Sequence, residues 1–262
     1  MRTSERSLRR ALPFALALSL GFASLPPDAE GARNARAVAA CQLPAQIPGW
    51  HNEGFPTDFE VFLEPADTIQ AVMLLVDFPD APIDEADPTW QTAQAYDELH
   101  RGGLDFLSSA SYGSVQIELT VVDEWYRMSQ PSTAYGLDRA VTFEQQVAYI
   151  KEAVALADPD VDFSAIDIVY VAVAPNAAGI SNSPGYIDAS DSRITADGVP
   201  ISHGATLGTS VWDWLEPDRP LVIAHETAHV FSLPDLYAFS GEPFHRFVGG
   251  WDLMGSLDGA AP

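Results

Sequence analysis

Cysteine and lysine are almost absent from this chain of 262 residues. Cys41 is the only cysteine, so no disulfide can form within the chain. Lys151 is the only lysine, and the formal net charge is −24. Such an acidic surface repels phosphate backbones and anionic lipid, so we expect no nucleic-acid partner. Apolar residues make up 47% of the chain, which is enough to build a folded core.

Long apolar runs are also scarce, and the main one lies near the N-terminus. Basic residues between positions 2 and 10 precede the apolar stretch Ala11–Leu25, which is too short to span a bilayer. We therefore interpret residues 1–40 as a signal peptide with its processed end, and we expect a secreted mature chain without a transmembrane segment. The segment Val38–Cys41 resembles a lipid-attachment box, so a lipid anchor at Cys41 is the alternative.

Composition divides the rest of the chain into two parts. Residues 41–67 are rich in proline and acidic groups, which indicates a lead-in or short pro-segment. Residues 68–262 carry the periodic patterns of a folded domain. Within them, Ile69–Phe78 and Ile168–Ala174 are near-continuous apolar runs, typical of strands buried on both faces. Phe143–Ala157 has apolar residues at helical spacing and predicts a helix.

Further patterns complete an α/β fold. Thr142 and Gln145 form a capping box in front of the predicted helix. Alternation over Val115–Val121 predicts a strand with one solvent-facing side. Trp90–Ser111 predicts a helix interrupted at Gly102 and Gly103, and Ala205–Trp214 is our candidate edge strand after a loop-like stretch over 175–204. Because strands and helices alternate, we expect a twisted, mostly parallel sheet.

The strongest chemical signal is the run His225-Glu226-Thr227-Ala228-His229 inside an apolar helix predicted over Leu221–Phe231. Residues four apart share one helix face, so both imidazoles can reach one metal ion. Buried imidazole pairs are costly unless they are ligated or hydrogen-bonded. Zinc accepts neutral imidazole, and Glu226 stands where it can act on a water molecule without being a ligand. The run predicts a zinc site with Glu226 as general base.

A catalytic zinc site needs a third protein ligand and an open position. The downstream candidates are Asp235, Glu242, His245, Asp252 and Asp258. We favour Asp235, because Pro234 ends the helix and turns the chain back towards the histidines. His245 is the second choice.

Two segments, HETAHVFSLPDLY and GGWDLMGS, resemble the immune inhibitor A family of secreted bacterial metallopeptidases, which belongs to the metzincin group. The upstream segments LLVDFPD, SYGSV and DPDVDFSAID are similar to that family as well, so the resemblance covers roughly residues 69–256. It implies a metzincin-like catalytic domain with a backing helix and an active-site helix. It also implies a zinc-dependent endopeptidase that acts on proteins or peptides.

The family pattern carries over to individual residues. It implies His225, His229 and Asp235 as metal ligands, Glu226 as the catalytic base and Met254 as the packing methionine of a Met-turn beneath the metal. The resemblance also implies a C-terminal subdomain, which is short or missing here, so we expect a C-terminally truncated domain.

One residue departs from the family pattern. Where the family has glycine, this chain has Ser232, which must adopt a left-handed conformation at a cost of about 1 kcal/mol. The family uses glycine to turn towards its third ligand, so the serine bears on the position of Asp235.

Other interpretations remain open from the sequence. A catalytically impaired, peptidase-like zinc-binding or adhesion module would explain the early end and Ser232, whereas Glu226 favours catalysis. A zinc hydrolase acting on bonds other than peptide bonds is a further alternative. The carboxylates of Asp158, Asp160 and Asp162 could hold a structural calcium ion, although they lack the glycine and glutamate of a calcium loop, and a solvated loop is the alternative.

Overall fold

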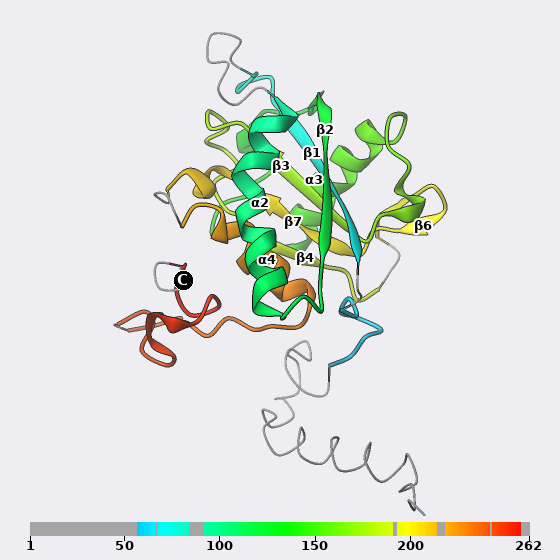
Figure 1. Cartoon of the computed structure of the whole chain (residues 1–262). Coiled ribbons are helices and arrows are strands. Elements are labelled where there is room, and N and C mark those ends of the chain that lie inside the picture. Colours follow the sequence, from blue (N-terminus) through cyan, green and yellow to red (C-terminus); the bar gives the residue numbers. More distant parts are fainter. Residues whose placement is uncertain are drawn as a thin grey trace, which may run out of the picture. The chain divides into compact units, whose positions relative to one another are not determined.

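The computed structural model describes residues 57–65, 68–83, 92–190, 193–213, 218–241 and 243–257. The signal peptide and lipid-anchor predictions, residues 1–41, lie outside this part of the chain, as do most of the lead-in segment and the candidate ligands Glu242 and Asp258. The described residues form an α/β fold around a five-stranded sheet, shown in Figure 1. None of the helices in these ranges is long and apolar enough to cross a bilayer.

The sheet has the strand order β2-β1-β3-β7-β4 and is mostly parallel. Only β4, at one edge, runs antiparallel to its neighbour β7. A separate two-stranded sheet is formed by β5 and β6. The strands are β1 (Ile69–Asp77), β2 (Ile117–Arg127), β3 (Ile168–Val173), β4 (Gly185–Ile187), β5 (Thr195–Ala196), β6 (Val199–Pro200) and β7 (His203–Leu207).

Helices cover both faces of the large sheet (Figure 1). On one face, α3 packs with alternate residues of β1 and β3 in one apolar cluster. On the other face, α2 and α4 share a second cluster with the remaining residues of those strands. The helices are α2 (Ala93–Ala110), α3 (Phe143–Ala157) and α4 (Leu221–Val230), and the short 3-10 helices are η2 (Ser132–Ala134), η3 (Phe163–Ala165), η4 (Thr209–Asp213) and η5 (Gly249–Trp251).

The two central strands explain the continuous apolar runs of the sequence. Every residue of β3 is buried, and β1 is buried at all positions except Gln70. Helices on both faces require apolar side chains at successive positions, so the prediction of two doubly buried strands is confirmed. The alternating strand prediction is confirmed as the edge strand β2, which continues to Arg127. The capping box of Thr142 and Gln145 is also present at the start of α3.

The predicted interruption at Gly102 and Gly103 is wrong, because α2 continues unbroken to Ala110. The reason is the close packing of α2 against α4. A Cβ atom on Gly103 would lie 2.1 Å from the backbone oxygen of Pro220 and 2.8 Å from a methyl carbon of Ile223. Glycine is therefore used here for a close helix approach, and the packing outweighs its low helix propensity.

The predicted edge strand Ala205–Trp214 is also wrong. Its first residues belong to β7, which lies inside the sheet between β3 and β4. Thr209–Asp213 forms a 3-10 helix, and residue 214 lies outside the described residues. The edge is instead β4, within a stretch that the sequence pattern presents as loop. A strand of three residues is too short to show a periodic pattern.

Candidate metal centre

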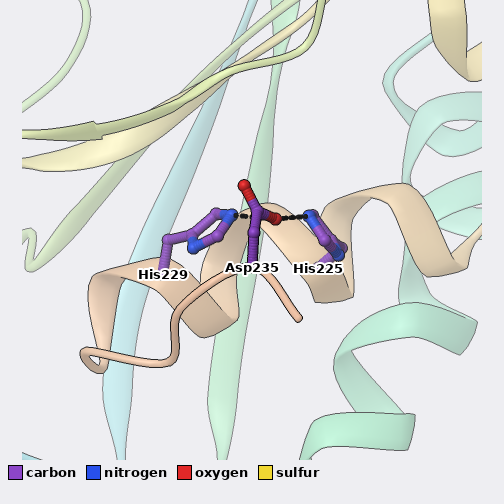
Figure 2. Close-up of side chains that lie close together, drawn as sticks. All are labelled: His225, His229 and Asp235. Carbon is purple, nitrogen blue, oxygen red and sulfur yellow. Dashed lines mark ion pairs between the residues drawn. The ribbon is translucent and has the colours of Figure 1, made fainter. Parts of the chain in front are cut away.

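Helix α4 presents His225 and His229 on its one partly exposed face. The apolar residues of α4 are buried in the cores on either side, and they fix the orientation of the helix: Leu221, Val222, Ile223, Ala224, Ala228 and Val230. The two imidazole rings lie one turn apart, with centroids 4.9 Å from each other and planes at 89°. Figure 2 shows both rings turned towards the same space above the helix.

A tight turn after α4 brings Asp235 back to the histidines. Ser232 has a φ of +71°, and its N–H donates to the carbonyl of His229 at 2.9 Å. The N–H of Leu233 donates to the carbonyl of Ala228 at 3.1 Å. These two bonds form a Schellman motif, which needs a left-handed residue and usually takes glycine there. The expected left-handed conformation of Ser232 is confirmed, and Asp235 still reaches the histidines.

The carboxylate of Asp235 lies between the two rings (Figure 2). Its Oδ1 atom is 3.1 Å from Nε2 of His225 and 3.4 Å from Nε2 of His229. Within the described ranges, these three residues form the only group of histidine, cysteine or acidic side chains close enough to hold a metal, with ligand atoms within 4.8 Å of one another. The structure therefore brings together the residues that the sequence singles out.

Backbone carbonyls determine which nitrogen of each ring carries the proton. Nδ1 of His225 lies 3.0 Å from the carbonyl oxygen of Leu253, and Nδ1 of His229 lies 2.8 Å from that of Leu233. A carbonyl oxygen only accepts hydrogen bonds, so each Nδ1 carries the donated proton. In the neutral imidazole this leaves a lone pair on Nε2, directed at Asp235. Metal-binding histidines usually have this arrangement.

The geometry fits a divalent ion between the three side chains. When both rings are neutral and carry their proton on Nδ1, neither Nε2 atom can donate, and the buried Oδ1 of Asp235 then has no hydrogen-bond partner. Two ligand atoms at about 2.0 Å from a tetrahedral ion stand about 3.3 Å apart. The observed nitrogen–oxygen distances of 3.1 and 3.4 Å match that spacing. Two imidazoles with one carboxylate are a donor set that suits zinc and also ferrous iron.

The electrostatics of the metal-free site reflect this close contact. Burial alone would lower the pKa of His229, but its hydrogen bond with Asp235 and the charges of Glu226 and Asp235 outweigh burial and raise that pKa to about 9. Burial opposes ionisation of Asp235, yet the hydrogen bonds from both histidines hold its pKa well below the usual range. The site thus favours positive charge between the rings and the carboxylate.

The side chain of Glu226 points to the edge strand β4. Its Oε2 atom accepts a hydrogen bond of 2.8 Å from the backbone N–H of Gly185 in β4. Burial raises the pKa of Glu226, although the neighbouring charges of His225 and His229 oppose the change. Sequence reasoning missed Gly185, because it lies 41 residues away in a stretch without a recognisable pattern.

Tyr237 is a second residue that sequence reasoning missed. Its ring stacks against that of His225, with centroids 6.4 Å apart and planes at 22°, and also against Phe244 at 4.5 Å. Its hydroxyl donates a hydrogen bond to Asp235, which helps to lower the pKa of that carboxyl group. The position within LPDLY is the one signal that could have pointed to it.

Met254 packs beneath α4. It is buried in an apolar cluster with Leu221, Ala224, Ala228 and Leu253, and its carbonyl accepts a bond of 2.8 Å from the N–H of Leu236. The Met254 segment thus contacts both the helix and the chain that follows Asp235. This placement agrees with a packing role.

The remaining sequence candidates lie elsewhere. His245 is exposed, and Asp252 caps the N–H of Met254 at 2.8 Å. The possible calcium ligands do not converge, as the solvated-loop alternative predicts: Asp160 accepts a bond from Tyr126, and Asp162 caps Ser164. These acidic groups have structural partners in a loop.

No family model matches the chain, and no curated protein matches its sequence.

Proposed function

We propose that this chain is a secreted zinc-dependent endopeptidase with a metzincin-like catalytic domain, similar to immune inhibitor A. The observation that supports it best is the convergence of His225, His229 and Asp235, with Glu226 beside them on α4. A glutamate next to the first histidine has no role in holding the metal, but it has one in hydrolysis.

Zinc is the ion we propose, because two imidazoles and one carboxylate are a ligand set of hydrolytic zinc sites, in which the fourth position is left for water or substrate. His225, His229 and Asp235 would hold it. When bound, zinc supplies Lewis acidity, which lowers the pKa of water towards neutrality and polarises a carbonyl group.

Glu226 performs the proton transfers of the proposed reaction. Its carboxylate takes a proton from water as the water oxygen forms a bond to the scissile carbonyl carbon. When the carbon–nitrogen bond breaks, Glu226 passes that proton to the leaving amine. The hydrogen bond from Gly185 orients the carboxylate for both steps, since it fixes one of the two oxygens at 2.8 Å from the edge strand.

The edge strand β4 provides the alignment of the peptide. Two backbone hydrogen bonds join this edge to β7: the N–H of Asp188 donates to the carbonyl of Ser202 at 2.8 Å, and the N–H of Thr206 donates to that of Pro184 at 3.0 Å. The backbone N–H and C=O groups of the even-numbered residues along β4 therefore point towards β7. In antiparallel pairs the intervening residues direct their N–H and C=O groups to the other side. At Gly185 these groups bind Glu226 and Gln146. The groups of Ile187 point outwards, where a peptide can add as a further strand.

The alternative function, an impaired zinc-binding module, was supported by the serine at position 232, where the family has glycine. That argument loses its force, because the left-handed turn forms with serine and Asp235 lies within 3.4 Å of both histidines. The early end of the chain carries no argument for either function.

The substitution Glu226→Gln tests the proposal. We expect the variant to bind one equivalent of zinc like the wild type and to hydrolyse casein about 100 to 10,000 times more slowly. Glu98→Gln makes the same chemical change at an exposed position of α2 and should leave both quantities unchanged. Equal casein hydrolysis by the Glu226 variant and the wild type would remove the proposed role. A zinc-loaded wild type without hydrolysis would favour the binding module.

A further inference from the structure

A cavity of about 500 Å³ lies beside β4 and has no part in the metal centre. Its volume falls in the range of sites that bind small molecules or large side chains. The walls come from the edge strand, the loop after it, the start of α3 and the lead-in segment. The lining of the cavity includes Phe62, Phe143, Gly185, Ile187, Asp188 and Arg193.

Gly185 connects this cavity to the proposed catalytic base. The same residue lines the cavity and donates its N–H to Glu226 at 2.8 Å. Ile187 and the two residues after it also line the cavity, whereas the contact with Glu226 is made at Gly185 itself. A peptide that pairs along this edge must therefore pass the cavity within two or three residues of the scissile bond, since a strand advances by about 3.3 Å per residue.

At the cavity, one arginine is paired with two carboxylates. Arg193 forms ion pairs with Glu144 at 2.6 Å and with Asp188 at 3.5 Å, so its charge is balanced before any ligand binds. Asp188 also accepts bonds from the backbone N–H groups of Ser190 and Arg193, at 3.0 and 3.1 Å. Among the described residues at the cavity, an acidic substrate side chain would find no unpaired cation and would meet two carboxylates.

Aromatic and aliphatic groups form the rest of the surface. Phe143 stacks on the buried Tyr186, with centroids 5.8 Å apart and planes at 13°, and the guanidinium of Arg193 lies 5.1 Å from the centre of the Phe143 ring. Phe62 is 3% exposed. These contacts preform an apolar wall, which favours a large apolar guest.

Residues 61–63 are held in place as part of this wall. On either side of Phe62, the carbonyl of Val61 lies 3.0 Å from Nε2 of His203, and the N–H of Leu63 donates to the carbonyl of Val230 at 3.0 Å. The segment is thus bonded both to β7 and to the end of α4.

We propose that the cavity is a specificity pocket that binds a bulky apolar side chain of the peptide substrate on the N-terminal side of the scissile bond. The inference rests on the proposed peptidase function. In antiparallel pairing, the more stable mode, the peptide runs from Ile187 towards Gly185 and meets the cavity before it reaches Glu226. Phenylalanine, tyrosine, leucine and methionine are the side chains that the walls suit.

Substitution of Ala189 by phenylalanine tests the pocket, because this exposed residue lines the cavity and a large side chain would fill it. Purified enzyme is incubated with a library of peptides, and the cleavage sites are read by mass spectrometry. For the wild type we expect large apolar residues to be enriched at one position two or three residues before the cut. In Ala189→Phe we expect that enrichment to fall at least tenfold relative to alanine and glycine, at that position alone.

Ala155→Phe is the matched control, since it adds the same ring to the exposed face of α3, about 18 Å along the helix from Phe143. It should leave the cleavage profile unchanged. Phe143→Ala is a second probe: it enlarges the cavity and should shift the preference towards tryptophan. Melting temperatures identify any variant that fails to fold, and the other variant then decides.

The outcomes separate the pocket from the peptidase function. No cleavage by zinc-loaded wild type, with Glu226→Gln as the blank, would contradict the peptidase function itself. Cleavage with the same profile in the wild type and both pocket variants would overturn the pocket assignment alone. A change confined to positions after the cut would overturn the proposed direction of the peptide.

Discussion

Gly185 and Glu226 are joined by a hydrogen bond of 2.8 Å between an edge-strand N–H and the proposed catalytic carboxylate. A Cβ atom on residue 185 would lie 3.2 Å from the backbone oxygen of Glu226 and 3.4 Å from Cβ of His229. We predict that Gly185→Ala pushes β4 away from α4 by a few tenths of an ångström and lowers kcat about tenfold while zinc content stays at one equivalent. Steady-state kinetics and metal analysis measure both, and an unchanged kcat contradicts the positioning role.

Removal of the Tyr237 hydroxyl should weaken the metal site. Tyr237→Phe keeps the ring contacts with His225 and Phe244 but loses the hydrogen bond to Asp235. Residues that orient metal ligands typically contribute about 10 to 100-fold to affinity, so we expect the zinc dissociation constant to rise by that factor. Competition with a chromogenic chelator measures it. Tyr112→Phe, at a residue 98% exposed, removes a hydroxyl from solvent and should have no effect.

The left-handed turn after α4 should tolerate glycine better than serine. Ser232 holds a φ of +71°, which a residue with a Cβ atom adopts at a cost of about 1 kcal/mol. Ser232→Gly removes this strain together with the hydroxyl, whereas Ser232→Ala removes the hydroxyl alone. We therefore expect the glycine variant to exceed the alanine variant by about 1 kcal/mol in free energy of unfolding. Urea denaturation of the pair tests this, and equal stabilities would contradict it.

Two adjacent glycines of α2 should respond oppositely to alanine. A Cβ atom on Gly102 would lie 3.5 Å from the nearest side-chain atom, an ordinary contact, so Gly102→Ala should stabilise the protein by about 0.5–1 kcal/mol. A Cβ atom on Gly103 would lie 2.1 Å from the backbone oxygen of Pro220. Gly103→Ala should therefore destabilise by about 1–3 kcal/mol through overpacking. Thermal unfolding of both variants decides, and a shift of the same sign would refute the packing argument.

His100 should make the protein sensitive to mild acid. The side chain is 1% exposed, and burial lowers its pKa to about 3. Between that value and the unfolded pKa of 6.5, the unfolded state binds a proton that the folded state does not, so stability falls as the pH falls through 6.5. From pH 7 to about 5.5 the loss is about 1 kcal/mol.

His100→Leu should remove this loss, and the comparison is the difference between variant and wild type in urea unfolding at the two pH values. The candidate metal ligands are the same in both proteins, so their contributions to the pH dependence of stability cancel in this difference. His245→Leu, at an exposed histidine, should follow the wild type. If His100→Leu loses as much stability as the wild type, the buried imidazole is not the cause.

The sequence predicts best those helices and strands whose surroundings are the same along their whole length. β3 is buried at every position, and a continuous apolar run predicts such a strand. The interior place of β7 and the edge place of β4 were not predictable, because they depend on pairings between distant segments. Gly103 misled the helix prediction for the same reason: its low propensity is local, but its cause is contact with Pro220 on another helix.

The candidate site shows the same division. His225 and His229 follow from helical spacing alone, and Asp235 is a natural candidate because all three lie within eleven residues, although the turn that returns it is made at Ser232 and not at Pro234. Gly185 and Tyr237 act through a backbone hydrogen bond and through a hydroxyl aimed at a carboxylate. Such contacts have no fixed sequence spacing, so they are visible only in three dimensions.

The hydrogen bond of 3.0 Å from Nδ1 of His225 to the carbonyl of Leu253 affects how the polypeptide after Asp235 is held in place. In the proposed metal centre, the ring of His225 would offer Nε2 to the metal while its Nδ1 holds the segment around Met254. Metal binding and the attachment of the chain after Asp235 to α4 would therefore be coupled through a single side chain.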